Sequence, residues 1–263
     1  MTASPAFTPL VLITGASSGI GQALAARYHR AGYRLALVAR RSAEVQTWAT
    51  SQGIGADRLV VYAADVRDVA AITSVGRRCI QELGLPDVVI ANAGISVGMD
   101  SSDFGDLDVM RATLETNLLG MAATFQPFVG GMGERRSGAL VGIASVAGIR
   151  GLPGHGAYCA SKSAVIAYCE SLRGECRPQG VRVVTIVPGY IDTPLTRQNR
   201  YGMPFLMAPD DFAERAFVAI AAGASYRVIP WQMGLVAKLL RMLPNALYDR
   251  LLAGRPRKHR RGE

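Results

Sequence analysis

Short apolar runs alternate with longer helical patterns along this chain, and this alternation restricts the fold more than any other feature. Expected strands lie at 10–14, 33–39, 59–63, 87–91, 139–144, 181–187 and 226–229. Each run is continuously apolar, which is typical of strands covered by helices on both faces. Strand–helix alternation favours right-handed crossovers between parallel strands. We therefore predict an α/β fold with one doubly wound parallel sheet (Rossmann fold) of about seven strands.

The length of 263 residues suits one large α/β domain with a sizeable core. Hydrophobic residues make up 49% of the chain, which is typical of a globular enzyme and not of a disordered or fibrous protein. Because no repeat or linker divides the sequence, we expect a single domain over residues 1–263. Within this domain we assign 8–195 to the cofactor and catalytic core, 196–230 to a substrate lid and the last strand, 231–254 to C-terminal helices, and 255–263 to a basic tail.

The first residues and the cysteines predict a cytoplasmic protein. Residues 1–5 have neither the basic region nor the apolar region of a signal peptide. Apolar runs stay shorter than the roughly 18 residues that a membrane-spanning helix needs. The four cysteines, Cys79, Cys159, Cys169 and Cys176, lack metal-ligand spacing, so we expect reduced thiols and no metal site.

The net charge of +9 is concentrated at the C-terminus. Five basic residues lie in the tail: Arg255, Arg257, Lys258, Arg260 and Arg261. We expect a frayed basic arm there, and the mild charge elsewhere argues against nucleic acid as a partner. Helices are expected at 233–242 and 245–252, after Trp231. They leave two interpretations open: peripheral contact with a membrane surface, or a cover over the substrate cleft or a partner subunit. Asp249 and the short helix lengths favour a cover.

A glycine-rich turn connects the first expected strand to a helix expected at 20–31. It reads T-G-A-S-S-G-I-G from Thr14 to Gly21. Glycines let the backbone approach a pyrophosphate closely, and the free N–H groups at the start of a helix bind the anion. The turn therefore predicts a dinucleotide site formed by Gly15, Ser17, Ser18, Gly19, Ile20 and Gly21.

The end of the second expected strand indicates which dinucleotide binds. An acidic residue at this position would accept hydrogen bonds from ribose hydroxyls, as in NAD-binding proteins. This chain has Arg40 and Arg41 instead, and a guanidinium group pairs well with a 2′-phosphate. The alternative is that both arginines only solvate the strand end. We favour NADP(H) over NAD(H).

Tyr158 and Lys162 are four residues apart and lie on one helix face. An ammonium group beside a phenol favours the phenolate, which lowers the phenol pKa from ~10 towards neutrality. Such a phenol can exchange a proton with an alcohol or carbonyl oxygen. Ser145 lies at the C-terminal end of a strand, where open α/β sheets bind their ligands, so its hydroxyl is placed to hold the substrate oxygen.

These motifs together resemble the short-chain dehydrogenase/reductase family over about residues 8–195, in the family's order. Asn117, Ser145, Tyr158 and Lys162 resemble its Asn-Ser-Tyr-Lys tetrad. The resemblance implies that Asn117 tethers a water and that Lys162 binds the nicotinamide ribose. It also implies further cofactor contacts, after several of the strands, from Asp65, Val66, Asn92, Ala93, Gly94, Tyr158, Lys162, Pro188, Gly189, Ile191 and Thr193.

The predicted activity is hydride transfer between NADP(H) and a hydrophobic ketone, aldehyde or secondary alcohol, as in a carbonyl reductase, with Tyr158 as general acid/base. One alternative is a non-catalytic NADP(H)-sensing protein, which the complete tetrad argues against. Another is a serine hydrolase, because Gly94 to Gly98 matches G-x-S-x-G with Ser96 as nucleophile. That motif needs a sharp strand-to-helix turn, and Ser96 lies several residues beyond its strand.

The substrate pocket is expected in the divergent C-terminal third. Residues in loops near the nicotinamide are its candidates: Leu152, His155, Tyr190, Met203, Phe205 and Leu206. Their largely apolar character suits a hydrophobic small-molecule substrate. The helices beyond residue 230 depart from the family's pattern, which places the usual tetramer in doubt. A homodimer through the helices that carry Asn117 and Tyr158 is expected instead.

Overall fold

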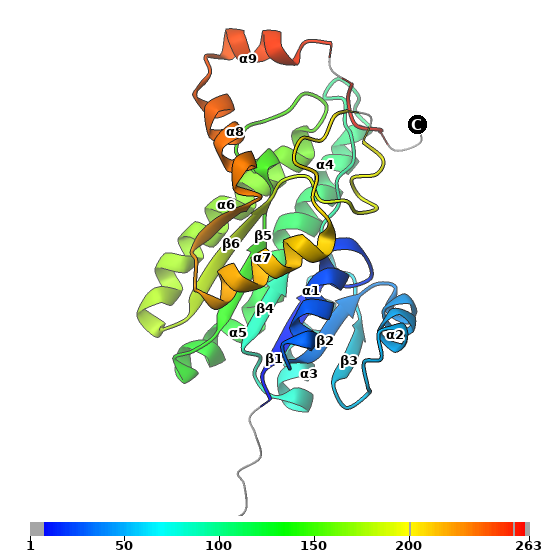
Figure 1. Ribbon diagram of the computed structural model, residues 1–263, viewed down its shortest axis with the longest axis vertical. Coiled ribbons are helices and arrows are strands. Elements are labelled where there is room, and N and C mark those ends of the chain that lie inside the picture. The colour runs from blue at the N-terminus through cyan, green and yellow to red at the C-terminus, as the bar shows by residue number, and fades with distance from the viewer. Residues whose placement is uncertain (1–7, 200, 255, 261–263) are drawn as a thin grey trace, which may run out of the picture.

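A seven-stranded parallel sheet forms the centre of the molecule (Figure 1). The computed structural model describes residues 8–199, 201–254 and 256–260. In chain order the strands are β1 (Leu10–Thr14), β2 (Arg34–Ala39), β3 (Leu59–Ala63), β4 (Val88–Ala91), β5 (Ala139–Ile143), β6 (Arg182–Pro188) and β7 (Tyr226–Ile229). Their order in the sheet is β3-β2-β1-β4-β5-β6-β7, which confirms the predicted doubly wound fold. The order reverses between β1 and β4, at the switch point where open α/β sheets bind ligands.

Helices cover both faces of the sheet (Figure 1). They are α1 (Gly19–Arg30), α2 (Ser42–Ser51), α3 (Val69–Leu83), α4 (Asp106–Leu114), α5 (Gly120–Arg135), α6 (Gly156–Cys176), α7 (Pro209–Ala221), α8 (Trp231–Met242) and α9 (Asn245–Leu252). Successive strand side chains point to opposite faces. Val11 and Ile13 therefore pack in the core under α1, α2 and α7, whereas Leu10 and Leu12 pack in the core under α3, α5 and α6.

Local sequence signals explain several helix boundaries. Asp68 caps α3, because its side chain accepts a hydrogen bond from Ala71 N at 2.9 Å. Pro209 opens α7 and is followed by Asp210 and Asp211, which complement the positive helix start. Between α4 and α5, Glu115–Leu119 forms a π-helical turn. Such turns often mark functional sites, and this one carries Asn117.

Beyond β7 the chain forms a second layer over the carboxyl ends of the strands (Figure 1). Helices α8 and α9 lie there, and residues 256–260 return from α9 to the loop between β4 and α4. Gly98 N donates to His259 O at 2.8 Å, and Arg260 pairs with Asp103 and Asp106. The predicted frayed arm is therefore wrong for residues 256–260, because ion pairs and backbone contacts hold this segment in place.

Parts of the sequence-based predictions fall on residues 1–7, Arg255 and Arg261, which lie outside the described residues. Within the described ranges, none of the helices combines the length and hydropathy that crossing a membrane requires. The four cysteines are buried and unpaired with one another.

Candidate active site

The glycine-rich turn leaves the start of α1 open. Ser18 is the N-cap residue of α1 with extended backbone, and its side chain makes no capping hydrogen bond. The first N–H groups of the helix thus keep their donor capacity for an anion. Gly15 has φ +69°, and a Cβ there would lie 2.7 Å from Ala93 Cα. Only glycine fits at this position, because the turn packs directly against the chain after β4.

A cavity of about 560 Å³ runs from this turn across the ends of β2 and β3 to Tyr158 and Lys162. It brings together nearly all of the predicted cofactor residues. These are Gly15, Ser17, Ser18, Gly19, Ile20, Arg40, Arg41, Asp65, Val66, Asn92, Ala93, Gly94, Tyr158, Lys162, Pro188, Gly189, Ile191 and Thr193. Gly21 does not line the cavity. Its missing side chain instead lets α1 pack against the Gly15 carbonyl, which a Cβ at position 21 would overlap.

Three arginines lie at the β2 and β3 end of this cavity. Arg67 binds Asp65 at 2.7 Å, and its hydrogen bonds hold the pKa of the Asp65 carboxyl below its ordinary value. Arg40 Nη1 lies 3.7 Å from the same carboxylate, and Arg41 Nη2 donates to Ser17 Oγ at 3.3 Å. Arg67 was not predicted from the sequence. The available signal was its place two residues after Asp65, at the end of a parallel strand.

Asn92 fastens the turn to the end of β4. Its Nδ2 donates to Thr14 O at 3.0 Å and to Gly15 O at 3.3 Å. Thr14 Oγ1 in turn accepts from the backbone N–H groups of Asn92 and Ala93. Asn92 therefore fixes the shape of the turn as well as lining the cavity.

Tyr158 and Lys162 lie on α6 at the inner end of this cavity. Lys162 is 4% exposed, and its Nζ donates to Ile143 O at 2.7 Å. Burial raises the pKa of Tyr158 to about 12 and lowers the pKa of Lys162 to about 8. The expectation that Lys162 brings the phenol pKa towards neutrality is wrong for this structure. Desolvation dominates, and the ammonium is directed to a carbonyl, 5.8 Å from the centre of the phenol ring.

Ser145 lies directly beyond β5 and faces Tyr158. Its Oγ accepts from Ala147 N at 3.2 Å, and its hydrogen bond with Tyr158 partly offsets the effect of burial on the tyrosine pKa. Ser145 and Tyr158 line the large cavity and also a second, smaller cavity beside it. The two side chains therefore stand at the junction of two binding spaces.

Asn117 is fully buried in the π-helical turn and joins three segments. Its Oδ1 accepts from Ile95 N at 2.8 Å, and its Nδ2 donates to Ile95 O at 3.0 Å and Ser161 Oγ at 2.9 Å. Ser161 Oγ donates to Tyr158 O at 2.8 Å. Ser161 was missed in the sequence, although it lies one turn after Tyr158 on the same helix. It links Asn117 to the backbone of the helix that carries Tyr158 and Lys162.

The second cavity, of about 130 Å³, contains only half of the predicted substrate residues. Leu152, His155 and Tyr190 line it. Met203, Phe205 and Leu206 do not, so their assignment is corrected. Phe205 and Leu206 are 50% and 48% exposed, and Met203 Sδ accepts from Asn199 Nδ2 instead. The opposite wall comes from residues that the sequence did not reveal: Arg150, Met233, Val236, Ala237, Leu240, Tyr248 and Lys258.

His155 is a buried residue at the start of α6. Its Nε2 lies 3.2 Å from Tyr201 Oη, and its Nδ1 lies 3.3 Å from Pro153 O. Burial lowers its pKa, and the nearby Lys258 lowers it further. His155 thus borders the pocket as a hydrogen-bonding group.

Ser96 does not occupy a nucleophile elbow. The chain after β4 is irregular, and α4 begins only at Asp106. The sharp strand-to-helix turn that a G-x-S-x-G nucleophile requires is therefore missing around this residue. Within the described part of the chain, no three histidine, cysteine or acidic residues gather as metal ligands.

Comparisons with known proteins identify the family of this chain. A family model described as short chain dehydrogenase matches residues 9–203. An uncharacterized oxidoreductase of Myxococcus xanthus is 37% identical over 238 residues, which cover 90% of this chain and 94% of that protein. Dehydrogenase/reductase SDR family member 7B of Bos taurus is 33% identical and covers 97% of this chain and 83% of its own. The short-chain dehydrogenase from Sphingobium yanoikuyae in complex with NADPH aligns with a TM-score of 0.74 at 25% identity, over 90% of this chain and 97% of that one. The chain belongs to the short-chain dehydrogenase/reductase family of oxidoreductases.

Proposed function

We propose that this protein is an NADP(H)-dependent oxidoreductase that interconverts a hydrophobic ketone or aldehyde and the corresponding alcohol, with Tyr158 as general acid/base. The observation that carries the proposal is the position of Ser145 and Tyr158 at the junction of the two cavities. A carbonyl group in the smaller cavity would meet the phenol and the serine hydroxyl beside the larger one. This is the arrangement that hydride transfer between two bound molecules requires.

The larger cavity fits NADP(H). The free N–H groups of α1 suit the pyrophosphate, and Arg40, Arg41 and Arg67 provide guanidinium groups for a 2′-phosphate. The Sphingobium relative was solved with NADPH. When bound, the nicotinamide supplies or accepts the hydride. The preference for NADP(H) over NAD(H) follows from the arginine cluster.

Each tetrad residue has a distinct task in this proposal. The Ser145 hydroxyl holds the substrate oxygen, and Tyr158 Oη exchanges a proton with it. Lys162 holds the nicotinamide ribose. Its Nζ also donates to Ile143 O, which holds the ammonium near the phenol of Tyr158. Asn117 positions Ile95 and α6 and keeps a lone pair of Oδ1 for a water.

A sensor that binds NADP(H) without turnover is the second candidate. Nothing in a sensor would require Tyr158 and Ser145 to face a separate apolar cavity, so catalysis is favoured. We also propose a homodimer through the helices that carry Asn117 and Tyr158. Leu119 in the π-helical turn is exposed, as are Phe104 and Leu107 at the start of the neighbouring α4. Peripheral membrane contact through α8 and α9 is a weaker proposal, since the tail's charges are partly engaged by Asp103 and Asp106.

The direct test is a panel of ketones, aldehydes and secondary alcohols, followed through NADPH absorbance. We expect turnover of apolar carbonyl compounds with NADPH and slower turnover with NADH. Tight NADPH binding without turnover of any compound would favour the sensor, and absence of binding would contradict the proposal.

A further inference from the structure

The substrate cavity contains a buried lysine that the tetrad does not use. Lys258, in the returning C-terminal segment, is 6% exposed and lines this cavity with Tyr158 and Ser145. Among the described residues, its Nζ makes one hydrogen bond, to Leu195 O at 3.1 Å. No carboxylate in the described part of the chain pairs with it. Burial lowers its pKa to about 8, which reflects a cation removed from water without an opposite charge.

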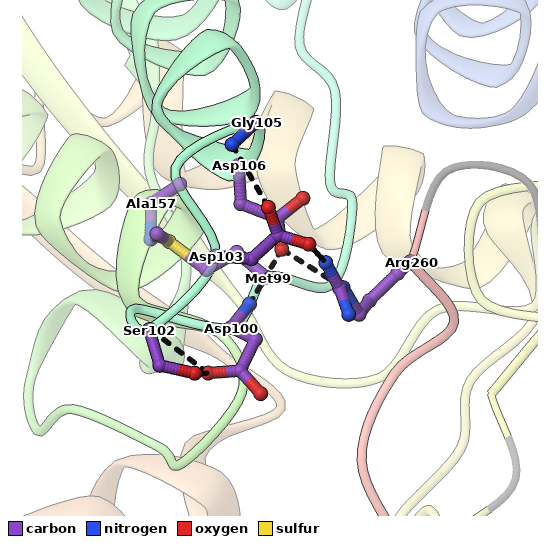
Figure 2. Close-up of polar contacts among 8 residues, drawn as sticks. All are labelled: Met99, Asp100, Ser102, Asp103, Gly105, Asp106, Ala157 and Arg260. Atoms are coloured by element: carbon purple, nitrogen blue, oxygen red, sulfur yellow. Dashed lines mark hydrogen bonds and ion pairs between the residues drawn. The ribbon is translucent and has the colours of Figure 1, made fainter.

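Ion pairs and close backbone contacts fix the position of the segment that carries Lys258. Arg260 donates to Asp106 Oδ2 at 2.9 Å and pairs with Asp103 (Figure 2). Asp106 is buried and also accepts from Asp100 N at 2.6 Å, so this anchor is tied to the loop before α4. A side chain at Gly98 would overlap the Lys258 carbonyl. The backbone therefore passes as close to the β4–α4 loop as glycine allows.

Among the described residues, the formally charged side chains that line the substrate cavity are all basic. Arg150 and Lys258 line it, and none of its described lining residues is Asp or Glu. Arg150 is largely occupied, because it binds Leu240 O, Leu243 O and Asn245 Oδ1. Within the described ranges, Lys258 uses only one of its three N–H donors. The rest of the wall is mainly aliphatic and aromatic.

Burying a cation with unused donors in an apolar cavity is energetically unfavourable unless an anion pairs with it. We propose that Lys258 binds an anionic group of the substrate, so that the preferred substrate is a carbonyl compound with an apolar chain and a carboxylate or phosphate group. This inference rests on the proposed oxidoreductase function and adds its substrate class. Carboxylate and phosphate groups both have anionic oxygens that accept charge-assisted hydrogen bonds from the ammonium of Lys258.

The test compares matched substrates with NADPH as cofactor. Straight-chain keto acids of increasing length are measured beside their methyl esters and beside the matching ketone phosphate monoesters. We expect kcat/KM to exceed that of the neutral ester by roughly ten- to a hundredfold for at least one anionic compound. The carboxylate and phosphate arms identify which anion the site takes. Equal values for anionic and neutral compounds would overturn the inference and leave the oxidoreductase function standing. No turnover of any compound would contradict that function itself.

Variants separate the charge of Lys258 from its packing. Lys258→Gln is expected to remove the preference for the anionic substrate, so that kcat/KM for the keto acid falls to about the value for its methyl ester. Lys258→Arg is expected to retain most of the preference. Lys238→Gln, which removes the same charge from the exposed face of α8, is the matched control and is expected to behave like the parent. Equal losses for both substrates in Lys258→Gln would show a purely structural lysine and overturn the inference.

Binding gives a readout that does not depend on turnover. A saturated carboxylic acid of the preferred length is expected to raise the unfolding temperature of the parent, whereas the matching primary amide is not. Lys258→Gln should lose this response. Arg260→Ala should weaken it, because Lys258 is then no longer anchored over the cavity. An acid response that persists in Lys258→Gln would overturn the inference.

Discussion

The two cavities that meet at Tyr158 are built in different ways. The cofactor cavity is formed by the glycine turn and the ends of neighbouring parallel strands, so its residues come from short motifs. The substrate cavity is walled by segments that lie far apart in the chain: the loop after β5, helices α8 and α9, and the C-terminal residues. Local backbone geometry therefore determines the cofactor side, whereas long-range side-chain contacts determine the substrate side.

Polar side chains, and not sheet hydrogen bonds, hold the substrate side together. Arg150 binds carbonyl oxygens at the end of α8 and stacks on Tyr248, whose hydroxyl donates to Gly151 O at 2.6 Å. Arg260 joins the tail to the β4–α4 loop. Contacts of this kind can change without disturbing the sheet, so one cofactor platform can carry different substrate walls.

The largest effect is expected from filling the glycine turn. Gly15→Ala adds a Cβ against the Ala93 backbone at a residue with positive φ. We expect a loss of about 2–5 kcal/mol in the free energy of unfolding, measured by urea denaturation, together with loss of NADPH binding. Gly174→Ala adds the same group to open space on α6 and should not destabilise the protein. A stable, NADPH-binding Gly15→Ala variant would show that the turn is less constrained than the structure indicates.

An intermediate effect is expected from the arginine cluster. Arg40→Ala should reduce the ratio of NADPH to NADH affinity roughly tenfold, because one partly exposed guanidinium partner of the 2′-phosphate is lost. The measurement is a fluorescence titration with each cofactor. Arg77→Ala removes a charge from the exposed face of α3 and is the matched control. An unchanged ratio would argue against Arg40 as the discriminating residue.

The smallest effect is expected from Phe205. The sequence predicts this residue in the substrate pocket, but it does not line the cavity in the structure. Phe205→Ser should leave KM and kcat for apolar ketones unchanged and alter stability by less than about 0.5 kcal/mol, since the side chain is half-exposed. Steady-state kinetics and thermal unfolding measure both quantities. A several-fold rise in KM would restore Phe205 to the pocket and weaken the contrast between the two cavities.

The same contrast explains what the sequence could predict. The strands, the turn and the Tyr158–Lys162 pair follow from periodicities and spacings within a few residues, and Asp65 follows from the family resemblance. The position of the tail depends on the ion pair between Arg260 and Asp106, which lies more than 150 residues earlier in the chain. No local sequence pattern predicts that pair. The pKa of Tyr158 was predicted in the wrong direction, because spacing placed Lys162 nearby but did not reveal its hydrogen bond to Ile143 or the extent of burial.

The proposed function depends most on proton transfer by Tyr158 at the junction of the two cavities. Tyr158→Phe removes the hydroxyl and preserves the ring, so the measurement is kcat for carbonyl reduction together with the NADPH dissociation constant. We predict that kcat falls by about 10²–10⁴-fold while NADPH affinity and unfolding temperature stay close to those of the parent. Retention of kcat in a folded, NADPH-binding Tyr158→Phe variant would contradict the account.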